Sequence, residues 1–185
     1  MIRLTGGSKK GQSIRSIKKE GLRPTSSKVR EALFNIIGPQ LRGSRFLDLF
    51  AGTGSVGIEA LSRGAAHVTF VEREAEIFRL LKENIERLEI GTESTLIRAD
   101  AIKFLNRGVA FDLIYADPPY QAPVLEKLLP AVAGGDMITS NGLLIIEHFK
   151  KNHLPSAWGS LELTRRYPYG DSILSIYRPE SGRSE

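Results

Sequence analysis

From residue 46 onward, short apolar runs alternate with segments whose apolar residues recur at helical spacing. A strand that is apolar on both faces needs cover on both sides, and intervening helices supply that cover in a mostly parallel sheet. The pattern therefore predicts an α/β chain. The expected strands are 46–50, 68–71, 95–98, 111–116 and 143–148, and the expected helices lie at 55–62, 77–88, 102–105 and 124–133.

The two ends of the chain depart from this alternation. Residues 1–23 carry four glycines between short mixed segments, which predicts a loose β-hairpin or extended arm. Residues 24–27 offer capping residues for one amphipathic helix, with Lys28 and Arg30 off its apolar face. Near the other end, period-two alternation predicts an antiparallel strand pair. We expect a basic arm at 1–23 and an α/β domain at 24–185.

Composition excludes several kinds of chemistry. The chain has no cysteine, so disulfides, thiolate zinc sites, iron–sulfur clusters and thiol nucleophiles are excluded. Three histidines leave little for a metal cluster, and we expect no metal. No apolar run approaches the roughly 20 residues that cross a bilayer, and the first residues do not form a secretory signal. We expect a cytoplasmic protein, although the basic first 19 residues also fit a transit peptide.

The segment Gly52-Thr53-Gly54-Ser55-Val56-Gly57 follows a predicted strand and opens a predicted helix. In that context G-x-G-x-x-G is typical of a nucleotide loop, since glycines let the backbone turn sharply beside the helix N-terminus. Glu72 ends the next predicted strand, where an acidic side chain can accept both hydroxyls of a ribose. The alternative is a tight turn and a surface glutamate.

Asp48, at the end of the first strand, helps to separate the possible nucleotides. Its carboxylate would repel a pyrophosphate such as that of NAD, whereas S-adenosylmethionine carries an ammonium and a sulfonium. We therefore expect S-adenosylmethionine as the cofactor. Phe50 lies in the same loop, and Asp100 follows the third strand, where it can face the adenine.

The segment Asp117-Pro118-Pro119-Tyr120 follows the fourth predicted strand. Two prolines remove two amide donors, so the Asp117 carboxylate and the Pro118 carbonyl can both present acceptors to one spot. An exocyclic NH2 of a nucleobase supplies two matching donors, and Tyr120 offers a ring on which a flat base can stack. We interpret Asp117, Pro118 and Tyr120 as the catalytic group for methyl transfer to such an amine.

Three motifs together resemble one known family: Leu22-Arg23-Pro24-Thr25 with the following Val29 to Asn35, the loop from Asp48 to Gly54, and the tetrapeptide at 117–120. The chain is similar, over nearly its whole length, to the RsmD-type 16S ribosomal RNA guanine-N2 methyltransferases of bacteria. The resemblance implies a Rossmann-like class I methyltransferase fold with a small N-terminal β-hairpin extension implicated in holding RNA.

The resemblance also implies roles for residues of this sequence. Gly52, Gly54, Glu72 and Asp100 would bind the cofactor, with the Ala101 backbone at the adenine, while Asp117 and Tyr120 would hold the guanine. Family members carry Asp or Asn at the first position of the tetrapeptide, which favours orientation of the amine as the main role of Asp117, since an amide is a very poor base.

Charge is unevenly spread along the chain. Net charge is +5, yet residues 1–45 hold 11 Lys and Arg against 2 Asp and Glu. We expect this basic front end to bind 16S ribosomal RNA within a small-subunit particle. We also expect the protein to act as a monomer. The expected RNA contacts are Arg3, Lys9, Lys10, Arg15, Lys18, Lys19, Arg23 and Thr25.

Other interpretations stay open. The tetrapeptide suits any exocyclic amine, so a DNA adenine-N6 or cytosine-N4 methyltransferase is an alternative, as is a non-catalytic RNA-binding assembly factor. Glu147 and His148 are neighbours on a strand and should point to opposite faces, so we do not expect them to act as a pair. Trp158, a lone tryptophan among apolar neighbours, is interpreted as a packing residue.

Overall fold

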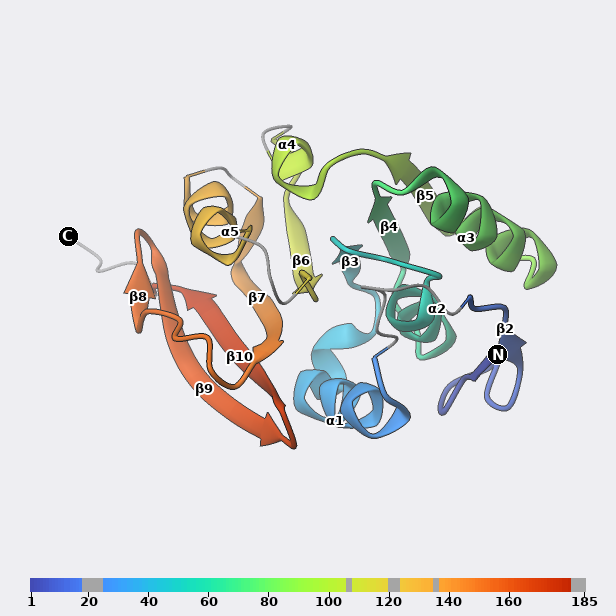
Figure 1. The fold of residues 1–185 in the computed structure, drawn as a ribbon, viewed down its shortest axis with the longest axis horizontal. Helices are drawn as coiled ribbons and strands as arrows, with labels where there is room; N and C mark the ends of the chain where they lie inside the picture. The colour runs from blue at the N-terminus through green and yellow to red at the C-terminus, as the bar shows by residue number, and fades with distance from the viewer. Residues whose placement is uncertain (18–24, 106–107, 120–123, 135–136, 181–185) are drawn as a thin grey trace. The chain divides into compact units, whose positions relative to one another are not determined.

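The computed structural model describes residues 1–17, 25–105, 108–119, 124–134 and 137–180 (Figure 1). The chain divides into two compact units, Met1–Ala101 and Ile102–Glu185. Of the residues singled out from the sequence, Lys18, Lys19, Arg23 and Tyr120 lie outside the described ranges. No helix within those ranges is long and apolar enough to span a bilayer.

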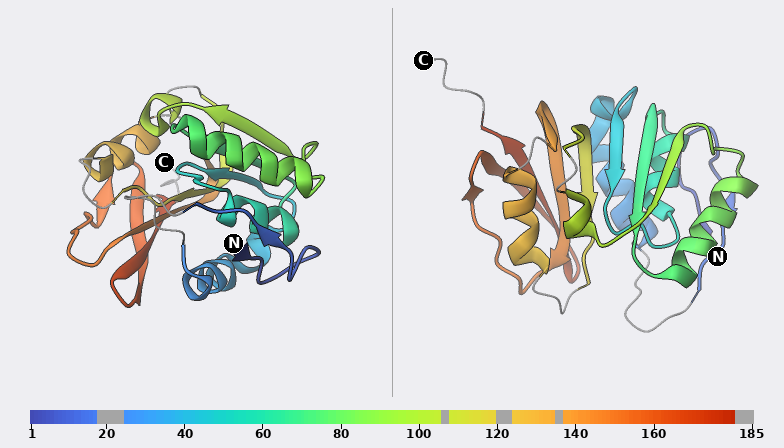
Figure 2. Two further views of the ribbon diagram at one scale, coloured as in Figure 1. Left: turned by 45° about the vertical axis from the view of Figure 1, so that its right-hand side comes forward. Right: turned by 90° about the horizontal axis from the view of Figure 1, so that it is seen from above.

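The first unit contains three parallel strands in the order β5 (Ser94–Arg98), β4 (His67–Glu72), β3 (Arg45–Asp48). β4 pairs with β3 through Phe70 and Asp48 and with β5 through Glu72 and Arg98. The helices α2 (Ser55–Ser62) and α3 (Ala75–Arg87) follow β3 and β4, and α3 lies against β4 and β5 (Figure 2). This confirms the predicted alternation of strands and helices in this part of the chain.

The predicted N-terminal hairpin is present, but it is anchored. Its strands β1 (Ile2–Arg3) and β2 (Ser13–Ile14) pair antiparallel. Leu4 and Ile14 are fully buried, and the Asn84 side chain of α3 hydrogen-bonds the backbone of Arg15 at both its N–H and its carbonyl. The expectation of a loose arm is therefore wrong, because apolar burial and backbone hydrogen bonds hold the hairpin in place.

The helix predicted after the hairpin is α1 (Ser27–Ile37), followed by the 3-10 helix η1 (Gly38–Leu41). The Ser26 side chain caps α1 by accepting from the Val29 N–H at 3.2 Å. Leu33, Phe34 and Ile37 are buried along its apolar face.

The second unit contains β6 (Phe111–Ala116) and β7 (Ile138–Phe149), which pair in parallel. Antiparallel strands β10 (Ser172–Pro179), β9 (Leu161–Tyr169) and β8 (Ala157–Trp158) continue this sheet in that order. Helix α4 (Ala101–Phe104) starts at the boundary of the units, and α5 (Val124–Ala133) lies between β6 and β7 in sequence. The antiparallel pair expected from the sequence is confirmed, with β8 as an added edge strand.

One residue of α1 contradicts the sequence interpretation. Arg30 is 1% exposed, and its Nε donates to Glu59 Oε2 at 2.7 Å, whereas the sequence pattern placed it off the buried face. Glu59 lies on α2 and is also fully buried. Its other oxygen, Oε1, accepts from the Arg63 guanidinium at 2.7 Å and from the Thr5 hydroxyl, while the Thr5 amide donates to Oε2 at 3.2 Å.

Hydrogen bonds decide the charge state of Glu59. Burial alone would raise the pKa of its carboxyl, but the hydrogen bonds from Thr5, Arg30 and Arg63 outweigh burial and lower that pKa below its ordinary value. The remaining Arg30 nitrogens donate to the carbonyls of Arg3 at 2.7 Å and Thr25 at 3.2 Å. One ion pair thus joins the hairpin, the start of α1, and α2.

We expect Glu59→Gln to lower the free energy of unfolding by about 3–5 kcal/mol at pH 7, because it leaves a buried guanidinium without its counter-charge. Since the lowered pKa favours the ionised form in the folded protein, the contribution exists above the unfolded pKa and disappears as pH falls through the folded one. Urea unfolding of the parent protein and of Glu59→Gln between pH 3 and 7 should therefore show a difference in unfolding free energy that becomes smaller in acid. Glu31→Gln, at an exposed position of α1, is the control and should change little; a gap independent of pH would contradict the account.

Candidate functional site

The glycine-rich loop runs from the end of β3 to the start of α2. Gly52 and Gly54 have φ values of +54° and +89°, which glycine adopts without the steric cost that other residues meet. Gly54 precedes the first residue of α2. The expected strand–loop–helix context of the motif is therefore confirmed, and amide groups of the loop and of the first turn of α2 lie together there.

Asp48, the last residue of β3, is hydrogen-bonded to the first turn of α2. The residue is 1% exposed, and its Oδ2 accepts a hydrogen bond from the Gly57 N–H at 2.9 Å. Burial raises the pKa of the Asp48 carboxyl to about 7, the hydrogen bond from Gly57 lowers it, and the nearby charge of Glu72 raises it further. An acid with a raised pKa costs stability when it ionises, so this group weakens the fold as pH rises from about 4 through about 7.

Glu72 is hydrogen-bonded to the backbone of the loop at Gly52. It ends β4, and its Oε2 accepts from the Gly52 N–H at 2.9 Å while its Oε1 accepts from the Glu74 N–H at 2.7 Å. Each carboxylate oxygen has more than one acceptor direction, so these bonds leave capacity for the hydroxyls of a ribose. The acid that the spacing singled out is thus in direct contact with the loop.

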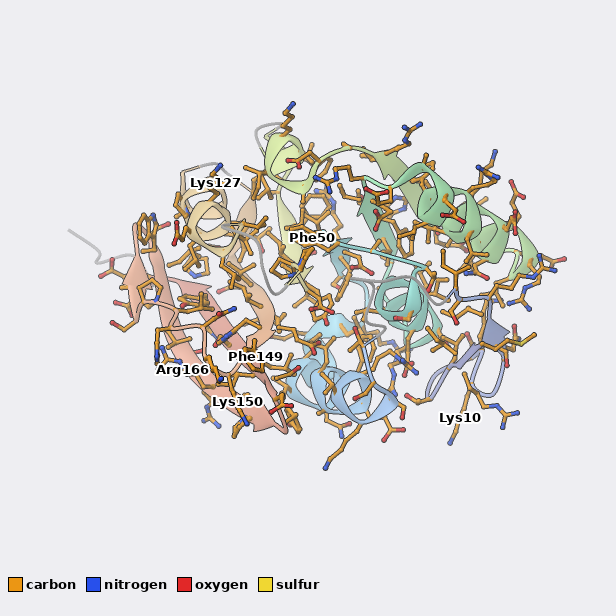
Figure 3. The ribbon with its side chains drawn as sticks, in the orientation of Figure 1. Lys10, Phe50, Lys127, Phe149, Lys150 and Arg166 are labelled. Carbon is orange, nitrogen blue, oxygen red and sulfur yellow. The ribbon has the colours of Figure 1, made fainter. Side chains whose placement is uncertain are left out.

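The other expected cofactor residues of the first unit lie near the ends of β3 and β5. Asp100 follows β5, is 39% exposed at its side chain, and lies 4.0 Å from the Arg73 guanidinium. Ala101 is buried at the first position of α4. Phe50 follows β3 and is half-buried (Figure 3).

These residues fit S-adenosylmethionine by their chemistry. The backbone amides of the loop and of the helix start can donate hydrogen bonds. The buried Asp48 can supply a counter-charge for a cation, and Glu72, at the end of β4, can accept hydrogen bonds from hydroxyls. Within the residues that the structure describes, no group of three or more His, Cys, Asp or Glu side chains is arranged to hold a metal ion.

The tetrapeptide at 117–120, which the sequence interpretation takes as catalytic, begins in the second unit. Asp117 and Pro118 directly follow β6; Asp117 is half-buried, Pro118 is buried and Pro119 is exposed. Tyr120 lies outside the described residues. The tetrapeptide is therefore placed at the carboxyl end of a parallel strand, where ligands of open α/β sheets bind.

Glu147 is a site candidate that the sequence interpretation set aside. In the β6–β7 register Ala116 is opposite Ile146, so Glu147 is one step beyond, beside the start of the tetrapeptide. The Tyr115 hydroxyl donates to its Oε2 at 2.7 Å, and both side chains are buried. Burial raises the pKa of Glu147, against the hydrogen bonds from Tyr115 and Ser172. Sequence spacing alone did not reveal this register.

His148 takes no part in that group. It is buried, and its Nε2 lies 2.8 Å from the Ser175 hydroxyl on β10, so it points to the other face from Glu147 as expected. Burial lowers the His148 pKa, which favours the neutral ring. Trp158, by contrast, is 46% exposed on β8, so its interpretation as a packing residue is wrong. It lies on β8, a two-residue strand at the edge of the sheet.

The hairpin presents the expected basic residues to different degrees. Arg3, Lys10 and Arg15 are exposed and Lys9 is half-buried, with Arg15 3.3 Å from Glu83. Lys10 is labelled on the hairpin in Figure 3. Thr25 is mostly buried, and its carbonyl binds Arg30. An open groove of about 760 Å³ lies between the hairpin and the start of α1, and Arg3, Lys10 and Ser26 are among its lining residues. That groove does not include the glycine-rich loop.

Comparison with known proteins adds a second kind of observation. A family model described as "Conserved hypothetical protein 95" matches residues 2–178. The chain is 39% identical to "Putative rRNA methyltransferase YlbH" of Bacillus subtilis over 96% of this chain and 98% of that protein. It is 31% identical to "Ribosomal RNA small subunit methyltransferase D" of Escherichia coli K12, over 97% of this chain and 91% of that one.

Solved structures agree in fold. "Putative methyltransferase yhhF" from Escherichia coli superposes with a TM-score of 0.87 at 31% identity, covering 98% of this chain and 99% of the other. An RNA methyltransferase from Salinibacter ruber in complex with S-adenosyl-L-homocysteine gives a TM-score of 0.68 at 13% identity, covering 88% and 98%. The expected Rossmann-like class I methyltransferase fold is confirmed.

The third glycine of the loop motif tests the packing under the site. A Cβ at Gly57 would lie 2.3 Å from a ring carbon of Phe70 on β4, so in Gly57→Ala either the buried Phe70 ring or α2 must shift. We expect a loss of about 1–3 kcal/mol in the free energy of unfolding, measured by urea titration, and weaker cofactor binding.

Gly91→Ala is the matched control, because a Cβ there has no atom within 4 Å. It should leave stability within about 0.5–1 kcal/mol of the parent. Equal stability of the two variants would show that α2 does not depend on this close approach.

Proposed function

The chain belongs to the RsmD-type family, whose model is described as "Conserved hypothetical protein 95", and from this premise we propose that it methylates ribosomal RNA. In full, the proposal is transfer of a methyl group from S-adenosylmethionine to the exocyclic N2 amine of a guanine in 16S ribosomal RNA. The relatives named for ribosomal RNA, one of them for its small subunit, support the RNA substrate over the DNA alternative. A substrate of this kind would place the enzyme in the cytoplasm.

The observation that carries the proposal is that two acids are hydrogen-bonded to the glycine-rich segment: Asp48 accepts from the Gly57 N–H, and Glu72 accepts from the Gly52 N–H. A pyrophosphate would meet a buried acid behind the loop, whereas a cationic cofactor would meet a counter-charge. All the side chains needed to bind the cofactor are present, which argues against the non-catalytic alternative.

When bound, S-adenosylmethionine supplies an electrophilic methyl group. Asp117 and the Pro118 carbonyl would accept the two N–H groups of the guanine amine and aim its lone pair at that methyl group. The ring of Tyr120 would stack on the base. Asp117 orients the amine in the first place and is also the nearest group of this set that can accept the proton released on transfer.

Basic residues of the hairpin complete the proposal. Arg3, Lys9, Lys10 and Arg15 would contact phosphates, together with Lys18, Lys19 and Arg23 and the neighbouring Thr25, so RNA binding should weaken as salt rises. Substitution of exposed lysines is the appropriate test of this role, because deletion of the hairpin would remove the buried Leu4 and Ile14.

We expect label from S-adenosylmethionine to appear in 16S RNA or in small ribosomal subunits prepared from cells lacking the activity, and not in duplex DNA. Asp117→Ala should reduce methyl transfer by at least 100-fold, since the orienting acceptor is lost, while calorimetry shows nearly unchanged cofactor affinity. Asp117→Asn should retain part of the activity, because an amide oxygen still accepts a hydrogen bond. Label in DNA alone, or a fully active Asp117→Ala enzyme, would refute the proposal.

Cofactor affinity should rise as pH increases from 6 to 8. The Asp48 carboxyl has a pKa of about 7, and a cationic ligand favours its ionised form, so binding should release a proton below that pH. Calorimetry in two buffers of different ionisation enthalpy measures this release directly.

Asp48→Asn should bind the cofactor more weakly and lose the pH dependence, because the amide keeps the Gly57 hydrogen bond but cannot ionise. Glu93→Gln, at an exposed acid, is the control and should retain it. Binding that releases no proton in the parent protein would contradict a role for Asp48 as the counter-charge.

A further inference from the structure

Three aromatic side chains lie on one face of the second unit's sheet. Across β7, β10 and β9, Glu147 is opposite Leu174 and Leu174 opposite Tyr167, while Phe149 is opposite Ser172 and Ser172 opposite Tyr169. Residues directly opposite one another in neighbouring strands share a face, and so do residues two apart on a strand. Phe149, Tyr167 and Tyr169 therefore form two adjacent rows, which we call the aromatic shelf.

The shelf is neither core nor fully solvated. Its three rings are half-buried, whereas Leu174 and Glu147 between them on the same face are buried. Trp158 lies at the opposite end of β9, because it pairs with Leu161 at the start of that strand. Phe149, Tyr167 and Tyr169 thus lie at the same end of the strands.

Basic side chains surround the shelf. The Lys151 ammonium lies 5.9 Å from the centre of the Phe149 ring, and Lys150 forms a 2.7 Å ion pair with Asp171. Arg165 is exposed on the same face, one row beyond Tyr167. Phe149 and Lys150 are seen together at the end of β7 in Figure 3, well apart from Lys127 on α5. The exposed cations Lys150, Lys151 and Arg165 outnumber the exposed carboxylate of Asp171 here, which makes this edge positively charged.

The shelf also begins beside the catalytic tetrapeptide. β6 and β7 are parallel neighbours, and Asp117 follows Ala116 at the level of Glu147, two residues before Phe149. Strands lie about 4.8 Å apart, so β9 with Tyr167 and Tyr169 is about 10 Å beyond β7. A strand of nucleic acid whose target base is at Asp117 would reach these rings with its next nucleotides.

We propose that the aromatic shelf binds the unpaired RNA nucleotides that flank the target guanine, with their bases on the rings and their phosphates near Lys150, Lys151 and Arg165. This inference rests on the proposed function. A guanine that enters the site leaves its stack, and its neighbours lose a stacking partner. Aromatic rings restore that contact without reading sequence, and nearby cations bind the backbone, as in single-strand binding surfaces.

The test is the dissociation constant for naked 16S RNA, measured by filter binding, together with KM and kcat for methylation. Substitution of Tyr167 and Tyr169 together by Ala should weaken RNA binding about 10-fold or more and raise KM, with cofactor affinity unchanged. The double substitution by Phe keeps the rings and should bind like the parent. Trp158→Ala removes an exposed ring at the other end of β9 and should have no effect.

The salt dependence of RNA binding distinguishes the contribution of the lysines from that of the aromatic rings. Lys151→Gln should lower the slope of log K against log salt concentration by about 0.7, the value for one phosphate of a single strand, while the Tyr variants keep the slope. Lys127→Gln, at an exposed position of α5, is the charge control and should keep it too.

The outcomes separate this inference from the function on which it rests. A normal affinity for RNA in the double Ala variant overturns the shelf, yet methylation of ribosomal RNA by the parent protein would still support the proposed function. Weaker binding to assembled subunits with unchanged binding to naked RNA also overturns it, because the shelf would then contact ribosomal protein. Absence of methylation by the parent protein would instead refute the function itself.

Discussion

The ion pair between Arg30 and Glu59 is the interaction on which the first unit depends. Two charges without access to water are costly unless every donor and acceptor is satisfied, and here Thr5, Arg63 and the carbonyls of Arg3 and Thr25 satisfy them. The same bonds fix the hairpin and α1 onto α2. Because α2 begins at the glycine-rich loop, the basic hairpin and that loop are attached to one helix.

The loop itself is held by acids that it would share with a ligand. Asp48 accepts from Gly57 and Glu72 from Gly52, so the backbone is already turned before any cofactor binds. Such preorganisation lowers the entropy cost of binding. The cost is paid in electrostatics, since a buried Asp48 with a pKa of about 7 is only partly ionised at neutral pH.

Local patterns predicted the features that depend on neighbours in sequence. Strand and helix alternation, the loop between β3 and α2, Glu72 at the end of β4 and the capping residue of α1 all follow from spacing. Arg30 could not be placed in this way, because its counter-charge is 29 residues further along the chain. Trp158 was misplaced since an edge strand leaves a ring uncovered, which residue type alone does not reveal. Glu147 was set aside because it and His148 point to opposite faces, and its place beside the tetrapeptide depends on strand register, which is a tertiary property.

Net charge also has a different meaning once the acids are located. The region from residue 46 onward carries more acids than bases, and the sequence interpretation assigned several of those acids to the binding of a cationic cofactor. The structure shows that burial raises the pKa values of two acids in this region, Asp48 and Glu147, one in each unit. At a given pH these two acids therefore carry less negative charge than exposed carboxylates would. Under the proposed function, Asp48 would ionise when the cationic cofactor binds and would add less negative charge near a polyanionic substrate before that.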